Sequence, residues 1–198
     1  MKLIGLTGGI ASGKSTVAAI LRRLGAAIVN ADELAREVVQ PGTPGWKEIV
    51  EAFGAEALQA DQTVDRQKLR TIVFNNPETR KKLEAIIHPR VRALAQKRIQ
   101  EHAASGSEIV VYEVPLLFEG NLQASLRPVV LVAADVATQK RRLRERDGLA
   151  ESEAEKHITA QMSLEEKRRL ADYVIENEGN IDHLERQVKE VLARIKAT

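Results

Sequence analysis

The stretch Gly8-Gly9-Ile10-Ala11-Ser12-Gly13-Lys14-Ser15 decides the fold, because it fits the pattern G-x-x-x-x-G-K-[ST] at every fixed position. The apolar run Leu3–Leu6 precedes it as a predicted buried strand, and Ser15–Leu24 follows it with apolar residues at helical spacing. A strand, a glycine-rich loop and a helix in this order are typical of a phosphate-binding loop. The alternative is a glycine-rich turn that binds nothing, and the agreement of strand, loop, helix and lysine argues against it.

Each fixed position of the loop has a physical role in holding a triphosphate. Glycine tolerates backbone angles that turn successive N–H groups inward, and the start of the helix adds free N–H groups and a positive dipole end. The Lys14 ammonium suits the β- and γ-phosphates, and the Ser15 hydroxyl suits Mg²⁺. We therefore predict that a nucleoside triphosphate and Mg²⁺ bind here, with contacts from Ala11, Ser12, Gly13, Lys14, Ser15 and Thr16.

Outside the loop, apolar runs alternate with helical patterns, which predicts an α/β fold with a parallel sheet of five strands. The remaining predicted strands are Ala26–Val29, Glu108–Val114, Pro128–Ala133 and Tyr173–Glu176. The remaining predicted helices are Asp32–Val39, Pro44–Phe53, Arg66–Phe74, Pro77 to about His102, Val136–Arg146, Glu151–Gln161, Leu164–Leu170 and Ile181–Ile195. Pro89 predicts a kink or a break after His88. We expect residues 1–198 to form a single domain, with helical insertions at about 41–104 and 138–170.

The composition excludes several classes of protein. The 198 residues contain no cysteine, which removes disulfides, thiolate metal sites and cysteine nucleophiles. The net charge of +2 is too balanced to indicate nucleic acid, and only six aromatic residues are present to stack on bases. No apolar run approaches the roughly 18 residues that span a membrane. We expect a soluble cytoplasmic protein that acts on small molecules, and the oligomeric state stays open.

Phosphoryl transfer also needs two further features: a group that takes the acceptor's proton, and positive charge around the transferred phosphoryl group. Asp32 is the first candidate for the base, because it follows the second predicted strand, where ligands gather in parallel sheets. The alternative, equally weighted from position, is that Asp32 only caps the next helix. For the positive charge, Arg142 and Arg146 share a helix face in the densest basic run, which could close over the nucleotide as a lid or could be merely solvated.

Three further residues stay open from their positions alone. His88 lies near Arg92, but a lone histidine is more often a structural hydrogen bonder than a catalyst. Glu113 and Glu119 flank the end of the third predicted strand and could serve Mg²⁺ through water or orient the acceptor. An ordinary strand-to-loop transition would explain them equally well.

In its ordered series of motifs the chain resembles the dephospho-coenzyme A kinase family over nearly its whole length. The resemblance rests on the loop Gly5–Ala18 and on the later blocks Asn30-Ala31-Asp32, Asp65-Arg66, Ile87-His88-Pro89 with Arg92, Val114–Glu119, Gln139, Arg142, Arg146, Gln161, Lys167, Ala171-Asp172 and Asn177. It implies ATP-dependent phosphorylation of the ribose 3′-hydroxyl of dephospho-coenzyme A, the last step of coenzyme A biosynthesis. The open alternatives are another small-molecule or nucleoside kinase of this sheet type, a nucleotide switch, or a nucleic-acid-dependent ATPase.

The same resemblance assigns roles to the candidate residues. It implies that Asp32 is the base, that Lys14 and Arg142 stabilise the transferring phosphoryl group, and that Arg146 joins them at ATP. It further implies that His88 and Arg92 bind the acceptor and that residues 138–170 form the lid. The architecture that it implies is an α/β fold of the P-loop NTPase type, a parallel five-stranded sheet with helices on both faces.

The chain departs from the family pattern at three places. Ala11 stands where glycine is frequent, and the loop keeps its shape provided that φ of Ala11 is negative. Glu113 stands in place of an aspartate, which makes a direct Mg²⁺ contact doubtful there. Arg127-Pro128 replaces a more usual aspartate-containing lead into the fourth strand, a change we interpret as structural.

Overall fold

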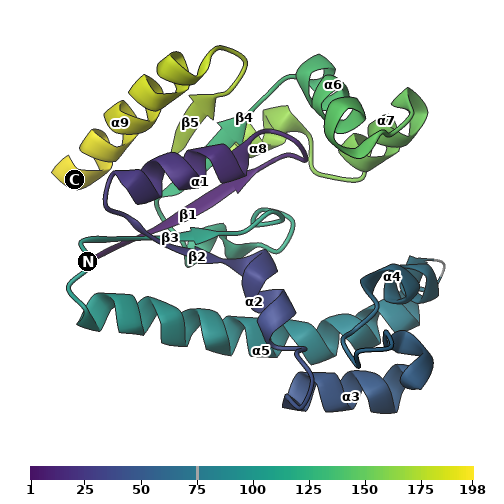
Figure 1. Cartoon of the computed structure of the whole chain (residues 1–198). Helices are drawn as coiled ribbons and strands as arrows, with labels where there is room; N and C mark the ends of the chain where they lie inside the picture. The colour runs from purple at the N-terminus through teal and green to yellow at the C-terminus, as the bar shows by residue number, and fades with distance from the viewer. Residues whose placement is uncertain (75) are drawn as a thin grey trace. The chain divides into compact units, whose positions relative to one another are not determined.

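The computed structural model describes residues 1–74 and 76–198, and its centre is a five-stranded β-sheet (Figure 1). The strands are β1 (Lys2–Gly8), β2 (Ala27–Asn30), β3 (Ile109–Glu113), β4 (Val129–Ala133) and β5 (Tyr173–Glu176). Their order is β2-β3-β1-β4-β5, and β1 pairs in parallel with both β3 and β4, as β4 does with β5. The predicted parallel sheet is confirmed. Because β1 lies between β3 and β4, the loop that follows it opens at the point where the strand order reverses, which is where such sheets bind ligands.

The hydrophobic core lies between the sheet and two helices, α1 (Lys14–Arg23) and α9 (Ile181–Ala197). These helices contribute the buried residues Val17, Ala18, Ile20, Leu21, Leu184, Val188, Leu192 and Ile195 to one cluster with residues of β1, β3, β4 and β5. The other face of the sheet is covered as well, since all five residues of β3 and of β4 are buried. On that face a Cβ at Gly5 would lie 2.9 Å from the Leu117 side chain, so the backbone of β1 is packed too closely there for a side chain.

Three helices form the segment predicted as the lid. They are α6 (Val136–Asp147), α7 (Glu151–Thr159) and α8 (Leu164–Leu170), and α6 packs on α7. Their starts are chemically defined: the Asp135 carboxylate accepts the Thr138 N–H at 2.6 Å, and Ser163 and Glu166 form a capping box at α8. The capping contact with Thr138 lowers the pKa of Asp135. A short 3₁₀ helix, η2 (Leu122–Ala124), lies between β3 and β4.

The chain divides into two compact units, Met1–Val29 with His102–Thr198, and Asn30–Glu101. The second unit holds α2 (Ala31–Glu37), α3 (Pro44–Phe53), the 3₁₀ helix η1 (Ala55–Ala57), α4 (Arg66–Phe74) and most of α5 (Pro77–Ala104). It therefore begins at the end of β2, about ten residues before the predicted insertion. The predicted single domain of 1–198 stays a prediction.

Helix α5 runs through Pro89 from Pro77 to Ala104, so the predicted break after His88 is wrong, whereas the alternative, a kink, stays a prediction. Proline lacks the N–H that would donate to the carbonyl four residues earlier, and its ring crowds that turn. The guanidinium of Arg90 donates to the Ile86 carbonyl, one residue after the Ala85 carbonyl that Pro89 leaves without its backbone donor.

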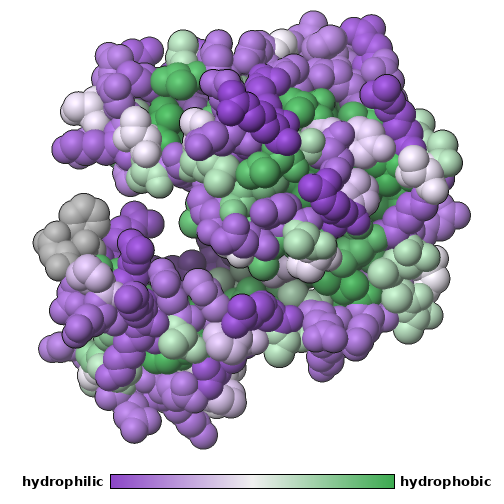
Figure 2. Space-filling model, turned by 180° about the vertical axis from the view of Figure 1, so that it is seen from behind, coloured by the Kyte–Doolittle hydropathy of each residue, from purple (hydrophilic) through white to green (hydrophobic). Residues whose placement is uncertain are grey.

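The surface carries few large hydrophobic side chains. In the part of the chain that the structure describes, Met1, Leu116, Val136 and Ile181 are the exposed ones, and they come from separate segments. Figure 2 accordingly shows hydrophobic residues set among hydrophilic ones on the face drawn there. None of the helices in the described ranges is both long and apolar enough to cross a membrane.

Candidate active site

The loop between β1 and α1 is held by side chains that come from far along the chain. Three consecutive carbonyl groups, those of Ile10, Ala11 and Ser12, each accept a hydrogen bond from outside the loop. In a trans peptide the C=O of one residue and the N–H of the next point in opposite directions. Fixing these carbonyls outward therefore turns the next N–H groups toward the opposite side of the loop.

Two glutamines hold Ile10. The Gln139 Nε2 of α6 donates to the Ile10 carbonyl at 2.9 Å, and the Ile10 N–H donates to Gln161 Oε1, also at 2.9 Å. Gln139 is buried, and a Cβ at Gly9 would lie 2.5 Å from its Nε2. Gln139 in α6 and Gln161 between α7 and α8 are thus bound to the same residue of the loop.

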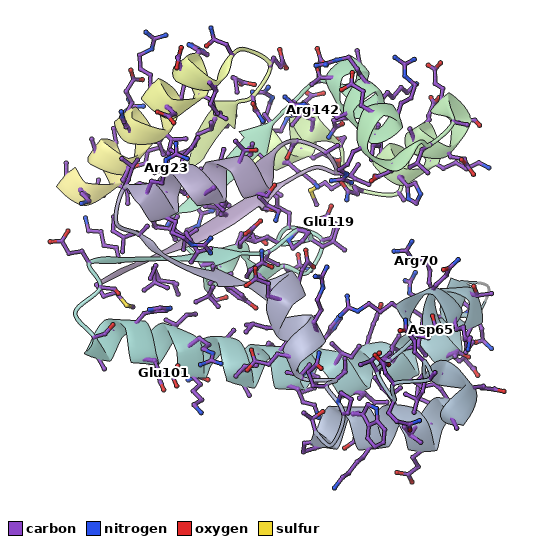
Figure 3. All side chains as sticks on the ribbon, in the orientation of Figure 1. Arg23, Asp65, Arg70, Glu101, Glu119 and Arg142 are labelled. Atoms are coloured by element: carbon purple, nitrogen blue, oxygen red, sulfur yellow. The ribbon has the colours of Figure 1, made fainter. Side chains whose placement is uncertain are left out.

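Arg142 and Asn177 hold the next two carbonyls. Arg142 Nη1 donates to the carbonyls of Ala11 and Ser12, each at 3.2 Å, and Arg142 Nη2 donates to the Asn177 carbonyl at 2.8 Å (Arg142 is labelled in Figure 3). The Asn177 side chain donates to the Ser12 carbonyl at 2.7 Å. Partial burial lowers the pKa of Arg142, and the neighbouring Arg141 charge adds to this effect. Arg142 reaches the carbonyl side of the loop in this structure.

The opposite side of the loop presents open donors. Within residues 1–74 and 76–198, the backbone N–H groups of Ala11, Gly13, Lys14 and Ser15 donate to no protein acceptor, whereas the Ser12 N–H donates to the Gly9 carbonyl at 3.1 Å. Ser15 and Thr16 are exposed at the start of α1. Such a set of converging N–H groups at a helix start is an anion site. The phosphate contacts predicted for residues 11–16 stay a prediction.

The Lys14 ammonium forms an ion pair and hydrogen bond with Glu113 Oε1 at the end of β3. Glu113 is 3% exposed and Lys14 is mostly buried, so the pair lies in a poorly solvated place beside the loop. Glu113 thus contacts the lysine of the loop directly, a partner that its position in the sequence did not reveal.

The backbone angles of the loop correct one expectation. Ala11 has φ of +55°, not the negative value that the sequence argument required. This left-handed conformation strains a residue with a Cβ, which explains why glycine suits the position. Gly13 has φ of +87°, and a Cβ there would lie 2.0 Å from the Asn177 side-chain nitrogen, so both angle and space demand glycine. The Ser12 hydroxyl is buried without a hydrogen-bond partner in the described chain.

Glu119 has a structural partner instead of a free carboxylate. Its Oε1 lies 2.9 Å from Lys167 Nζ and accepts the Met162 N–H at 3.1 Å (Glu119 is labelled in Figure 3). The Lys167 side chain is 1% exposed, and its ammonium is poorly aligned for a hydrogen bond, so the attraction is mainly Coulombic. This buried pair fixes α8 to the segment after β3.

Arg146 lies apart from the loop contacts. It makes a two-point ion pair with Asp147, at 2.8 and 2.7 Å, and these hydrogen bonds raise the pKa of Arg146 and lower that of Asp147. The structure therefore brings Arg142 to the loop and leaves Arg146 exposed on the same helix.

In the unit Asn30–Glu101, Asp32 is exposed in the first turn of α2. The cap of that helix is Asn30, whose side chain accepts the N–H groups of Asp32 at 2.8 Å and Glu33 at 3.2 Å. The interpretation of Asp32 as a mere helix cap is therefore wrong. Burial lowers the pKa of Arg66, and the positive charge of Arg36 adds to this shift, whereas the negative charge of Asp32 opposes it. Asp32 and Arg36 therefore both lie near Arg66.

His88 and Arg92 lie one turn apart on α5 and are both exposed. Neither forms a hydrogen bond or an ion pair with any residue in the described ranges, so both side chains are open to a ligand. Arg66 was not among the predicted site residues. It lies far from Asp32 in the sequence, so a local sequence pattern could not show that the two side chains are close.

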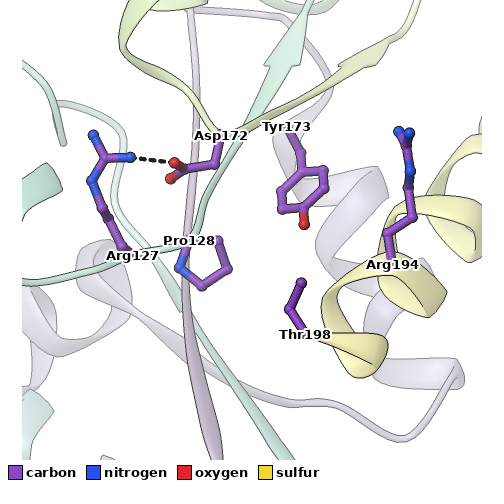
Figure 4. Close-up of a pocket in the computed structure, with 6 residues that line it drawn as sticks. All are labelled: Arg127, Pro128, Asp172, Tyr173, Arg194 and Thr198. Atoms are coloured by element: carbon purple, nitrogen blue, oxygen red, sulfur yellow. Dashed lines mark hydrogen bonds and ion pairs between the residues drawn. The ribbon is translucent and has the colours of Figure 1, made fainter.

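A separate hollow lies at the amino ends of β4 and β5, away from the loop (Figure 4). Its lining includes Arg127 and Asp172, which form an ion pair, while Asp172 Oδ2 also accepts the Val129 N–H at 2.7 Å. The aspartate thus joins the start of β4 to the start of β5. This agrees with the structural interpretation of Arg127-Pro128, whose peptide bond is cis.

Comparison with known proteins gives consistent matches over nearly the full length. The dephospho-CoA kinase family model matches residues 2–183. The dephospho-CoA kinase of Geobacter metallireducens is 51% identical over 188 residues, which cover 95% of this chain and 94% of that protein. Among solved structures, a Thermus thermophilus protein gives a TM-score of 0.85 at 39% identity and covers 98% of this chain and 97% of its own. The dephospho-CoA kinase from Campylobacter jejuni gives 0.72 at 29% identity, with 97% and 96% covered.

The matches extend well beyond the phosphate-binding loop, which many nucleotide-binding proteins share. The matched range, residues 2–183, also contains the side chains that hold the loop: Gln139, Gln161, Arg142 and Asn177. Loop, sheet order and full-length similarity lead to one conclusion: this chain belongs to the dephospho-CoA kinase family.

Proposed function

We propose that the protein transfers the γ-phosphoryl group of ATP to the ribose 3′-hydroxyl of dephospho-coenzyme A, giving coenzyme A and ADP. The family and the P-loop kinase fold support the reaction class. The single observation that carries the site is the outward fixing of the Ile10, Ala11 and Ser12 carbonyls, which leaves N–H groups on the other side for a polyphosphate.

The residues of the loop supply charge and orientation for transfer. In this proposal Lys14 leaves Glu113, or shares its charge with it, to bind the β- and γ-phosphate oxygens, and Arg142 stabilises the transferring group. Arg146 joins at the ATP phosphates from the same helix. Both arginines must then exchange their present partners for phosphate oxygens.

Mg²⁺ fits the donors at the loop. The exposed Ser15 hydroxyl is one oxygen ligand, and no group of three or more His, Cys, Asp or Glu side chains suited to a metal occurs in residues 1–74 and 76–198. Mg²⁺ typically takes one or two protein oxygens, phosphate oxygens and several waters, so a single hydroxyl with few carboxylates suits it. When bound, the ion would neutralise charge between the β- and γ-phosphates.

Asp32 is proposed as the general base that accepts the proton of the 3′-hydroxyl. Its carboxylate is exposed and is not used as a helix cap, so it is available to an acceptor. His88 and Arg92 are proposed to bind the acceptor, whose phosphates suit a guanidinium. Both substrates are small molecules, and we place the enzyme in the cytoplasm on the basis of its composition.

An acceptor screen tests the assignment. Purified protein with ATP–Mg²⁺ should release ADP with dephospho-coenzyme A and not with nucleosides, nucleoside monophosphates or shikimate. The product should carry the new phosphate at the ribose 3′ position, which phosphorus NMR identifies. Turnover with a nucleoside monophosphate and none with dephospho-coenzyme A would reject the proposal, as would ATP hydrolysis that depends on added DNA or RNA.

A further inference from the structure

Asn177 is the first residue after β5. As a neutral amide it supplies neither the general base nor the positive charge that phosphoryl transfer needs, so its place beside the loop calls for another role. It is 7% exposed, its N–H donates to the Ala133 carbonyl at 2.8 Å, and its own carbonyl accepts Arg142 Nη2. Its backbone is therefore fixed by β4 and α6. The side-chain amide then extends to the loop, 165 residues earlier in the sequence, and donates to the Ser12 carbonyl at 2.7 Å.

The peptide group between Ser12 and Gly13 is the one that this contact controls. Since C=O and N–H are opposed in a trans peptide, an amide that holds the Ser12 oxygen on one side holds the Gly13 N–H on the other. The Gly13 N–H has no protein acceptor in the described ranges and belongs to the open set with Lys14 and Ser15. The Asn177 amide also fills the space where a Cβ of Gly13 would be, which prevents this peptide from rotating toward it.

We propose that Asn177 is a positioning residue for the nucleotide, which acts through the Ser12–Gly13 peptide and contacts no phosphate itself. Arg142 also donates to the Ser12 oxygen, but this hydrogen bond is longer, at 3.2 Å, and the proposed reaction requires the Arg142 side chain to move. Asn177 keeps the peptide oriented when Arg142 leaves. This inference rests on the proposed function only in taking a triphosphate as the ligand of the loop. It does not depend on the identity of the acceptor.

The test compares Asn177→Ala and Asn177→Asp with Gln187→Ala. Asn177→Asp keeps the side-chain shape but replaces the N–H donor with an oxygen that repels the Ser12 carbonyl. Gln187 is the matched control, because its side chain makes two hydrogen bonds to the peptide groups of Glu176 at the end of β5, at 3.0 and 2.8 Å, without reaching the loop. Binding is measured by calorimetry with ATP–Mg²⁺, inorganic tripolyphosphate and adenosine, and folding by the thermal midpoint.

We expect Asn177→Ala to raise the Kd for ATP–Mg²⁺ and for tripolyphosphate by about tenfold, the effect of roughly one hydrogen bond. Asn177→Asp should raise both further, whereas adenosine binding and the KM for the acceptor should stay unchanged. Gln187→Ala should lower the thermal midpoint and leave all three affinities at the wild-type values.

Two results would overturn the inference. If adenosine loses as much affinity as tripolyphosphate, Asn177 contacts the base and does not orient the loop. If Asn177→Ala binds tripolyphosphate as the wild type does, the Ser12–Gly13 peptide does not depend on it. Failure of the acceptor assignment is separate, because it would appear as wild-type ATP binding without turnover of dephospho-coenzyme A.

Discussion

At the scale of single residues, the protein pairs charged side chains with each other in places that have little contact with water. Lys14 is the clearest case, because its ammonium lies against the buried Glu113 carboxylate instead of in solvent. A substitution here removes the partner of Glu113 together with the proposed ligand for phosphate. Activity and stability must therefore be measured separately.

Lys14→Ala should lower kcat/KM by about 10²–10³-fold, since one well-placed charge at a transferring group contributes on this order. The thermal midpoint should also fall, because Glu113 loses the neighbouring positive charge. The double variant with Glu113→Gln should recover stability and leave activity low. Recovery of activity together with stability would contradict a direct role of Lys14 at the phosphates.

Asp32→Asn should keep ATP–Mg²⁺ affinity and lose most phosphoryl transfer, because an amide cannot accept the acceptor's proton. Calorimetry and a coupled ADP assay give the two values. Asn30→Ala is the comparison, since it removes the cap of α2 and should cost about 1 kcal/mol of stability while the Asp32 carboxylate remains. Unchanged turnover in Asp32→Asn would show that this residue is not the base.

Ala11→Gly should stabilise the protein by about 0.5–1 kcal/mol, because φ of +55° strains alanine more than glycine's greater chain entropy costs. The expected rise in thermal midpoint is about 1–3 °C for a chain of this size. Gly25→Ala is the reverse change, at φ of +91° and with no atom within 4 Å of the added Cβ, and it should destabilise. A lower midpoint for Ala11→Gly would mean that the loop gains from the Cβ.

At the scale of elements, ion pairs and caps fix the helices that surround the loop. The pair between Glu119 and Lys167 joins α8 to the segment after β3, and Lys167 has almost no exposure to water. A buried ammonium depends strongly on its carboxylate, so the pair is costly to break from one side only.

A double-mutant cycle measures this dependence. Glu119→Gln should cost about 2 kcal/mol, less than for a fully buried pair, because the Glu119 side chain is 23% exposed. Adding Lys167→Met should restore most of the loss by removing the buried charge. Denaturant unfolding of the four proteins gives the coupling, and additive losses would show that the two side chains do not interact.

Much of the fold could be predicted because the signals are local. The apolar run of β1, the glycines after it and the helical spacing of α9 lie within short windows, and the predicted bounds of α3, α4, α8 and β5 agree with the structure. The continuation of α5 through Pro89 and the positive φ of Ala11 could not be predicted, because local preference opposes both a proline inside a helix and a positive φ at alanine. The hydrogen bonds from the Ile10 N–H to Gln161 and from the Asn177 side chain to Ser12 span more than 150 residues, and no short window of sequence contains both partners.

At the scale of the whole molecule, nucleotide and metal should act on stability through mass action. ATP–Mg²⁺ at about 100 times its Kd should raise the unfolding free energy by about 2.7 kcal/mol, which corresponds to roughly 5–10 °C in thermal midpoint. Removing Mg²⁺ with a chelator should abolish most of the shift from ATP. Lys14→Ala is the control and should show little shift in either condition. An equal shift with and without the metal would contradict a role for Mg²⁺ at Ser15.

The two hydrogen bonds of Ile10 differ in what can compete for them. An incoming phosphate oxygen is only an acceptor, so it can replace the Gln161 oxygen at the N–H but has nothing to offer the Ile10 carbonyl that Gln139 holds. An anion arriving at this residue can therefore displace Gln161, which lies between α7 and α8, while Gln139 of α6 keeps its hold on the Ile10 carbonyl. The segment is thus joined to the loop through one acceptor and one donor, and a negatively charged ligand competes with only one of these two contacts.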